Sequence, residues 1–133
     1  MEFKELKIKT SFREELIDIT DIIKNEIKAC NMVSGIIHIW IPHTTAAVTI
    51  NENADPDVPK DIVFALNKVV PNYIEFKHSE GNSDAHLKSS LMGCEQDVLV
   101  KSGQLWLGTW QGIFFCEFDG PRNRKINLMI DKK

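Results

Sequence analysis

Apolar and polar residues alternate at the start of the chain in a pattern that predicts two short strands. Apolar residues alternate with lysines over residues 6–10, and a second apolar run, residues 16–19, follows the polar stretch 11–14. Alternation with a period of two residues is typical of a strand with one buried face. We therefore expect the chain to begin as a β-hairpin.

Two longer segments carry apolar residues at helical spacing. The first is expected to run from Thr20, whose hydroxyl would cap it, to about Asn31. The second is expected to begin at Asp57, to have Pro59 in its first turn, and to end before Pro71. A shorter third helix is predicted over residues 85–92, which would place a histidine in its first turn.

The remaining apolar runs are rich in β-branched and aromatic residues and predict six more strands. The run 36–41 is so apolar that both of its faces are expected to be covered. The last four strands are expected to form a meander that closes through the turn 119–121. The order ββαββααββββ predicts one α+β domain over residues 1–133, a layered sandwich with a mixed, mainly antiparallel sheet and two to three helices. The six runs are 36–41, 46–50, 98–100, 104–107, 113–118 and 126–130.

Charge and cysteine content exclude several classes of protein. The formal net charge is -3, so nucleic acid and anionic membranes are not expected as partners. No apolar run approaches the length of a membrane span. Cys30, Cys94 and Cys116 are an odd number at wide spacings, which fits no disulfide framework and indicates a reducing compartment. We therefore expect a cytoplasmic protein, with buried, unreactive cysteines favoured over a nucleophile.

Histidines provide the main candidates for chemistry. His43, His78 and His86 fall in polar segments beside turns, whereas His38 lies inside an apolar strand and is expected to be structural. Neutral imidazoles are good ligands for zinc and related metals, and three of them leave a coordination position open for water or substrate. The spacing is not diagnostic, so unrelated surface histidines remain an equal alternative.

Other polar and aromatic residues are candidate neighbours of such a site. Glu52 and Asn53 directly follow a strand and could orient a histidine or a ligand. Trp110 and Gln111 lie between two glycines and could form one wall of a pocket, although a tight turn with a core tryptophan is an equal alternative.

Three segments together resemble the YjbQ-like family of secondary thiamine-phosphate synthase enzymes. They are residues 42–57, His78 with residues 85–88, and residues 108–113. The resemblance implies the same strand order, a homotrimer, and a site formed by the three histidines with nearby acids. It also implies a weak activity that joins a pyrimidine diphosphate to a thiazole phosphate.

On this basis we assign roles to particular residues. The predicted catalytic residues are His43, Glu52, His78 and His86, and the three histidines are also the predicted ligands of a divalent metal, Zn²⁺ or, with a diphosphate substrate, Mg²⁺. The predicted substrate-binding residues are Thr44, Thr45, Asn53, Lys88, Trp110 and Gln111. The substrate would be a small phosphorylated heterocycle.

Displacement of diphosphate requires neutralisation of charge on the leaving oxygens, by a metal ion or by cationic side chains. Lys88, Arg122 and Arg124 are the candidate cations, and either Glu80 or Asp84 is the candidate acid. The alternative function is a non-catalytic, trimeric module that binds a metal or a small ligand. An open coordination position would favour catalysis, and a closed shell of four ligands would favour a structural role.

Overall fold

The structure, a computed structural model, describes all of residues 1–133. Its elements follow the predicted order ββαββααββββ and confirm the α+β class. The helices are α1 (Thr20–Ala29), α2 (Asp57–Val69) and α3 (Ser83–Met92). The strands are β1 (Glu2–Lys9), β2 (Glu15–Asp18), β3 (Gly35–Trp40), β4 (Ala46–Glu52), β5 (Glu95–Lys101), β6 (Gln104–Leu105), β7 (Gln111–Glu117) and β8 (Asn123–Lys132).

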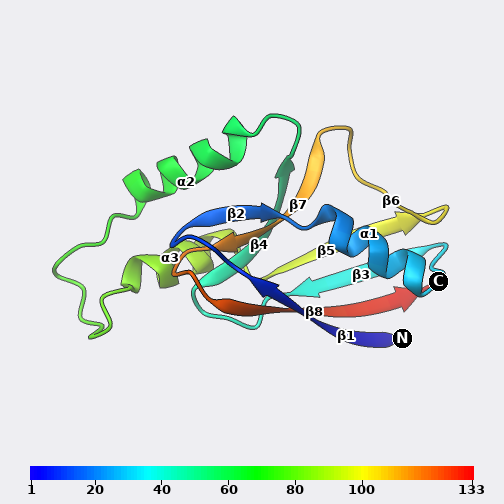
Figure 1. Ribbon diagram of the computed structural model, residues 1–133, viewed down its shortest axis with the longest axis horizontal. Helices are drawn as coiled ribbons and strands as arrows, with labels where there is room; N and C mark the ends of the chain where they lie inside the picture. The colour runs from blue at the N-terminus through cyan, green and yellow to red at the C-terminus, as the bar shows by residue number, and fades with distance from the viewer.

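The strands form two sheets (Figure 1). The large sheet has the order β1-β8-β3-β5-β6, and the small sheet has the order β2-β7-β4. Every pairing is antiparallel, so the expected mixed sheet is in fact two antiparallel ones. Because few strands pair with a neighbour in sequence, the topology depends on contacts between distant parts of the chain.

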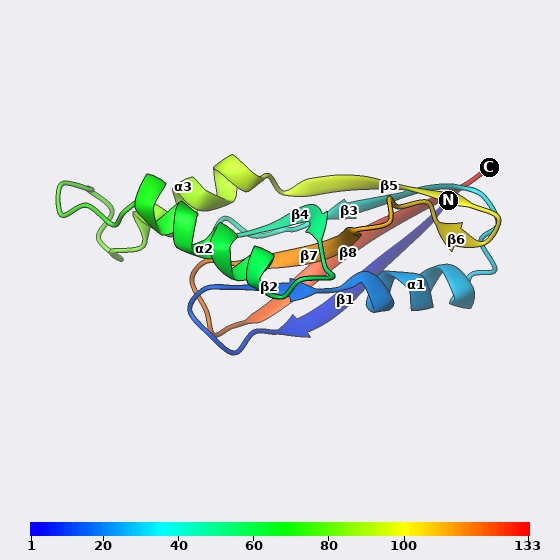
Figure 2. The same cartoon turned by 90° about the horizontal axis from the view of Figure 1, so that it is seen from above.

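The main core lies between the two sheets. Alternate residues of β3 and β8 point inward, as Ile37 and Leu128 do, and they meet Val48 and Phe115 of the small sheet. Helix α1 contributes Ile23 to the same core. Figure 2 shows α1 on the opposite side of the molecule from α2 and α3. Burial of these aliphatic and aromatic side chains is the main source of stability, roughly 2 kcal/mol for each.

A smaller core lies on the other face of the small sheet. Ala47 and Cys116 of that sheet pack against Ala85 of α3 and against Phe118. Alternation within β4 and β7 therefore sends side chains to two cores. Helices α2 and α3 cover this face and fix the segment between them, which carries two of the candidate histidines.

The predicted amino-terminal hairpin is wrong. β1 pairs with β8, whereas β2 pairs with β7 in the other sheet. The segment 10–14 crosses from one sheet to the other, and the backbone N–H of Thr10 donates to the carbonyl of Arg122 instead of to a partner in a hairpin. The alternation predicted both strands correctly, but it contains no information on pairing.

The predicted carboxyl-terminal meander is also wrong beyond its first pair. β5 pairs with β6, but β7 lies in the small sheet and β8 in the large one. The segment 118–122 crosses between the sheets directly beside the segment 10–14, and the N–H of Gly120 donates to the carbonyl of Arg13. The two crossings support each other through these backbone hydrogen bonds.

Two local expectations also differ from the structure. Helix α1 begins at Thr20, and the Thr20 hydroxyl donates to Asp18 and accepts from the N–H of Ile113, so it ties the helix to β7 instead of capping it. β3 is buried on one face only, because Trp40 on the other face is 49% exposed. The outer face of the large sheet is therefore open in the single chain.

No helix combines the length and the apolar character needed to cross a membrane.

Candidate functional site

Three chain segments that cross between the sheets meet at one end of the molecule. They are residues 10–14, residues 42–45 and residues 118–122. The amino-terminal end of α3 packs against the same region, since Asn82 donates to Asp119 at 2.7 Å. Loops held by rigid strands commonly present functional side chains. This end of the molecule therefore has the properties expected of a site.

A pocket of about 430 Å³ lies at this meeting point. Its lining is almost entirely polar and combines imidazoles, guanidiniums, hydroxyls and carboxylates. The lining residues are Pro42, His43, Thr44, Thr45, His78, Glu80, Asn82, His86, Asp119, Arg122 and Arg124. The structure thus brings all three predicted histidines and both predicted threonines together.

His43 is held in one orientation by the main chain of β8. Its Nε2 accepts the backbone N–H of Lys125 at 2.9 Å. Burial and the positive charge of Arg124 lower the pKa of His43, so the ring is neutral at pH 7. Because Nε2 is the acceptor, the proton of the neutral ring is on Nδ1. His43 can therefore donate a hydrogen bond to a ligand without carrying charge.

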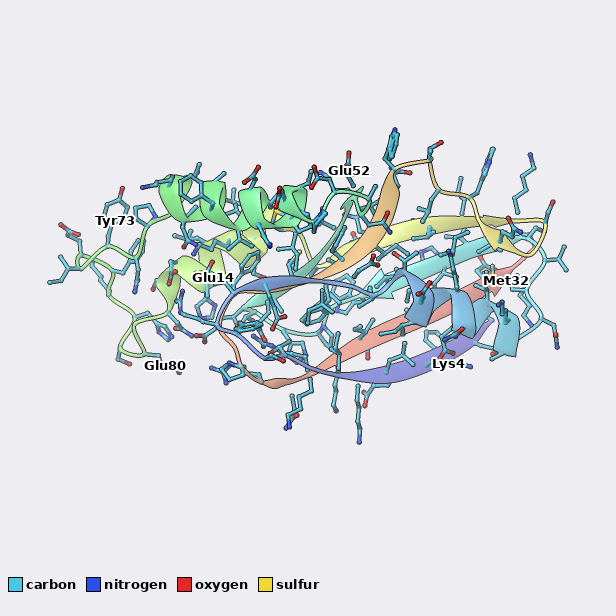
Figure 3. All side chains as sticks on the ribbon, turned by 45° about the horizontal axis from the view of Figure 1, so that its top comes forward. Lys4, Glu14, Met32, Glu52, Tyr73 and Glu80 are labelled. Atoms are coloured by element: carbon cyan, nitrogen blue, oxygen red, sulfur yellow. The ribbon has the colours of Figure 1, made fainter.

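His78 and His86 form a pair on the opposite wall. Their ring centroids are 5.3 Å apart and the rings are nearly perpendicular. Nε2 of His78 lies 4.0 Å from a carboxylate oxygen of Glu80, which is exposed at the tip of the loop (Figure 3). Neither histidine is hydrogen-bonded to the backbone. Both are available to bind a ligand or to exchange a proton.

A buried ion pair forms the floor of the pocket. Glu117 is fully buried and accepts hydrogen bonds from Nε and Nη2 of Arg124, which is only 5% exposed. Nη2 of Arg124 also donates to Thr45, whereas its Nη1 has no partner within the chain. Burial raises the pKa of Glu117, but hydrogen bonds from Arg124 and Thr10 outweigh it and keep the pKa below its ordinary value.

A second, more exposed cation lies at the rim. Arg122 pairs with Asp119 at 2.9 Å, and Asp119 also accepts from Asn82. Burial raises the pKa of Asp119, but these two hydrogen bonds outweigh it and the net pKa is lowered. Asn82 is buried, and its Oδ1 has no hydrogen-bond partner. Such an atom is costly to leave unsatisfied.

Lys88 does not reach the pocket, contrary to its predicted role in substrate binding. Its ammonium group is fully buried beneath α3, where it donates to Asp84 at 3.0 Å, to Glu14 and to Asn67. The amino-terminal crossing also supplies Arg13, which pairs with Asp84. Of the two candidate acids, Glu80 lines the pocket, whereas Asp84 is committed to this ion-pair network.

The candidates at the end of β4 and at the start of β7 form a separate group, away from the histidine pocket. Glu52 lies at the far end of β4 opposite Gln111, and Figure 3 shows it on the other side of the molecule from Glu80. Asn53 contacts Gly112 and donates to Asp18. Trp110 is 62% exposed and forms no wall of the histidine pocket. The seven residues of β4 separate the two groups within one chain.

The predicted three-histidine metal site is not assembled in this arrangement. No three His, Cys, Asp or Glu side chains are placed to hold one metal ion. The lone pair on Nε2 of His43 is engaged by the backbone N–H of Lys125. A metal ligand must offer a free lone pair. Bound metal stays a prediction, and the residues as placed do not fit a shell formed by His43, His78 and His86.

Sequence reasoning missed the carboxylates and the amide that surround the arginines. A signal for Glu117 exists, since a lone carboxylate in the apolar run 113–118 indicates a buried, paired charge. Asn82 and Asp119 carry no comparable signal, because only the unpredicted sheet crossings bring them together.

The architecture and the pocket define a class of small α+β sandwich proteins in which chain crossings between two antiparallel sheets build a polar pocket. The family model described as UPF0047 protein YjbQ-like matches residues 4–133. The chain belongs to this family.

Relatives and solved structures agree with this assignment. UPF0047 protein YugU of Bacillus subtilis is 53% identical over 128 residues, which cover 96% of this chain and 97% of the relative. A YjbQ/UPF0047 family protein from Clostridium acetobutylicum superposes with a TM-score of 0.93 at 50% identity and covers 96% of this chain and 99% of its own. A hypothetical protein from Aeropyrum pernix superposes with a TM-score of 0.94 at 36% identity and full coverage of both chains.

Proposed function

We propose that the histidine pocket binds the phosphate groups of a small phosphorylated heterocycle and that the protein is a low-level thiamine-phosphate synthase-type transferase. The observation that carries the proposal is the lining of the pocket. Three imidazoles and two guanidiniums converge there, and one guanidinium, that of Arg124, is buried with Nη1 unpaired. Guanidinium groups are well suited to phosphate oxygens.

An anion in this pocket depends on the histidines for positive charge. Asp119 and Glu117 already compensate Arg122 and Arg124, so an added anion requires further positive charge. Protonation of His78 and His86 can supply it, because a neighbouring phosphate favours the charged form of imidazole. Glu80 adds a third carboxylate, so the pocket carries a charge of about -1 with neutral imidazoles and about +1 with His78 and His86 both protonated.

The geometry suits displacement of diphosphate from a pyrimidine-bearing carbon. The thiazole ring nitrogen uses its lone pair to form the new carbon–nitrogen bond, while the carbon–oxygen bond breaks and diphosphate leaves with the electron pair. The attacking nitrogen carries no proton, so the reaction needs no general base. His78 or His86 can donate a proton to the leaving oxygens, and the fixed N–H of His43 can stabilise the developing charge.

A test is to supply the pyrimidine diphosphate and the thiazole phosphate together and to measure thiamine phosphate and released diphosphate. We expect His86→Ala to lower the rate by about a hundredfold, since loss of one such contact typically costs about 3 kcal/mol. Lys68→Ala is the control, because Lys68 lies on the surface of α2, 5.5 Å from the ring of Phe64, and does not line the pocket. Equal rates in wild type and His86→Ala would sink the transferase proposal.

Calorimetry with inorganic diphosphate separates catalysis from binding alone. Binding that His86→Ala abolishes, without any product in the assay, would leave the non-catalytic ligand-binding module as the function. Absence of both binding and product would remove the proposal altogether.

A further inference from the structure

A second pocket, of about 500 Å³, adjoins the histidine pocket. The two share His43, Thr44 and His86 in their linings. Beyond this shared wall, the second pocket is lined by Ser89, Ser90, Gly93 and Cys94 from the end of α3 and the turn that follows it. The two pockets are therefore adjacent compartments that meet at these three shared residues.

The two compartments differ sharply in charge. Every carboxylate and guanidinium of the pair lines the first compartment, where Glu80, Asp119, Arg122 and Arg124 lie. The second compartment is lined by hydroxyls, a thiol, a glycine and the two shared imidazoles, without a Lys, Arg, Asp or Glu side chain. A ligand that occupies both must have one charged end and one uncharged, hydrogen-bonding end.

The floor of the second compartment is fixed by the main chain. The carbonyls of Gly93 and Cys94 accept hydrogen bonds from Val48 and Ile41, which belong to or follow the central strands. A Cβ added at Gly93 would meet no atom within 4 Å, so open space lies above the glycine. The compartment is thus preformed and roomy next to the backbone.

One hydroxyl in this compartment is restricted to accepting hydrogen bonds. Oγ of Ser89 donates its proton to the carbonyl of Ala46 at 2.7 Å, so only its lone pairs remain for a ligand. This arrangement favours a ligand that presents an N–H, such as an amino-substituted ring.

We propose that the two compartments form one bipartite site, in which the neutral compartment holds an uncharged, amino-bearing heterocycle and the histidine compartment holds the phosphate attached to it. This inference takes one premise from the proposed function, namely that the histidine compartment binds an anion. His43 and His86 then stand at the junction, beside the bond between the ring-bearing carbon and the phosphate oxygen.

The rate at which a reagent modifies Cys94 reports whether the neutral compartment is occupied. It is half-buried, whereas Cys30 and Cys116 are buried, and burial raises the pKa of the Cys116 thiol to about 12. A small methylthio-transferring reagent should therefore modify Cys94 first. Cys94→Ser, which removes the reporter thiol, confirms the site of labelling.

The test compares two probes, inorganic diphosphate and an aminopyrimidine-methyl diphosphate, in the labelling reaction. We expect the pyrimidine compound to slow the labelling of Cys94 by about tenfold or more at saturation, and inorganic diphosphate to slow it by less than about twofold. Equal protection by both probes would overturn the bipartite site but leave the anion site intact. Binding of the pyrimidine compound without protection would also overturn it, and binding of neither probe would overturn the proposed function as well.

A steric variant provides an independent measurement. Ser90→Phe narrows the neutral compartment without touching any residue that is confined to the charged one. Its affinity for the pyrimidine diphosphate should fall by about tenfold, while its affinity for inorganic diphosphate should stay within about twofold of wild type. Leu91→Phe, at the neighbouring exposed position of α3, is the matched control and should change neither affinity. A parallel loss of both affinities in Ser90→Phe would contradict the inference.

Discussion

The pKa of His43 makes the free energy of unfolding depend on pH. Burial and the charge of Arg124 lower the pKa of His43 below its ordinary value of 6.5. A histidine with a lowered folded-state pKa favours the folded state fully above the unfolded pKa, and this contribution is lost as the pH falls. The loss of stability that His43 causes begins as the pH falls below about 6.5. Glu117 and Asp119 titrate at lower pH, because their pKa values are lowered from 4.5 and 3.8.

We therefore expect wild type to lose more stability than His43→Gln when the pH falls from about 7.5 to about 5. Urea unfolding at several pH values measures the difference. His38→Gln leaves His43 in place and should keep the wild-type dependence. Parallel pH profiles for wild type and His43→Gln would contradict the assignment.

The buried pair Glu117–Arg124 gives a second prediction. Replacement of one partner leaves the other charge buried without compensation, which typically costs about 3–5 kcal/mol. Glu117→Gln should therefore lower the free energy of unfolding by about that amount in urea titrations. The control is Lys125→Gln, since Lys125 pairs with Glu5 where both side chains are 51% exposed and the expected loss is below about 1 kcal/mol. Similar losses in the two variants would refute the role of burial.

Individual residues differed in how far the sequence could place them. His43, His78 and His86 were predicted from their position in polar segments, and the pocket contains all three. Lys88 was assigned to substrate binding as a candidate cation for the leaving oxygens, whereas the carboxylates of Asp84 and Glu14 hold its ammonium group in the interior. Composition and spacing do not reveal which charges a fold will pair.

At the scale of elements, α3 depends on the buried ammonium of Lys88. This group joins Asp84 of α3 to Glu14 of the amino-terminal crossing and to Asn67 of α2, and Figure 3 shows Glu14 against α3. The same helix carries His86. Lys88 is thus a positioning residue for one wall of the pocket.

Lys88→Met should cost roughly 2 kcal/mol of stability, since Arg13 still compensates Asp84, and should weaken binding of inorganic diphosphate several-fold. Lys68→Met is the control on the surface of α2, where Lys68 lies 5.5 Å from the ring of Phe64. Calorimetry and urea unfolding on the same preparations measure both effects. Unchanged diphosphate affinity in a folded Lys88→Met protein would exclude the positioning role.

Whether a segment forms a strand or a helix was easier to predict from the sequence than the strand with which it pairs. Apolar periodicity, apolar runs and turn residues together indicated every strand and helix in order, because burial of one face imposes a local period of two or 3.6 residues and turns end each element. The crossings at residues 10–14 and 118–122 were missed, because a short polar turn serves a hairpin and a sheet crossing equally well. The pocket lies at those crossings, so its composition was only partly predictable.

At the scale of the molecule, the outer face of the large sheet is open to solvent and exposes large apolar side chains. Trp40, Leu99 and Phe3 expose 49%, 47% and 76% of their surface on strands of this sheet. Helix α1 packs on the inner side, where it contributes to the core between the sheets, and α2 and α3 contact strands of the small sheet, so no helix covers the outer face. The same face carries charged residues such as Asp97 and Lys125, and subunit interfaces commonly combine apolar with polar side chains. The trimer implied by the family resemblance would bury it.

Light scattering should therefore give a mass of about three times the 15.2 kDa of the chain. Leu99→Glu, which replaces an exposed apolar side chain of this face by a charge, should shift the mass toward one chain. Val69→Glu, at a 71% exposed position at the end of α2, is the control and should leave the mass unchanged. A monomer mass for wild type at micromolar concentration would refute the prediction.

Strand β8 has a consequence for the order in which the protein becomes functional. The bonds from Lys125 to His43 and from Arg124 to Thr45 span sequence separations of 82 and 79 residues, and β1 pairs only with β8. A nascent chain synthesised as far as residue 122 already contains every histidine but lacks the strand that orients His43. At a synthesis rate of roughly 5–20 residues per second, β1 stays unpaired for several seconds or more until β8 has emerged from the ribosome. The end of the protein that carries the histidine pocket is therefore completed last, in the same late step that adds β8 to the large sheet.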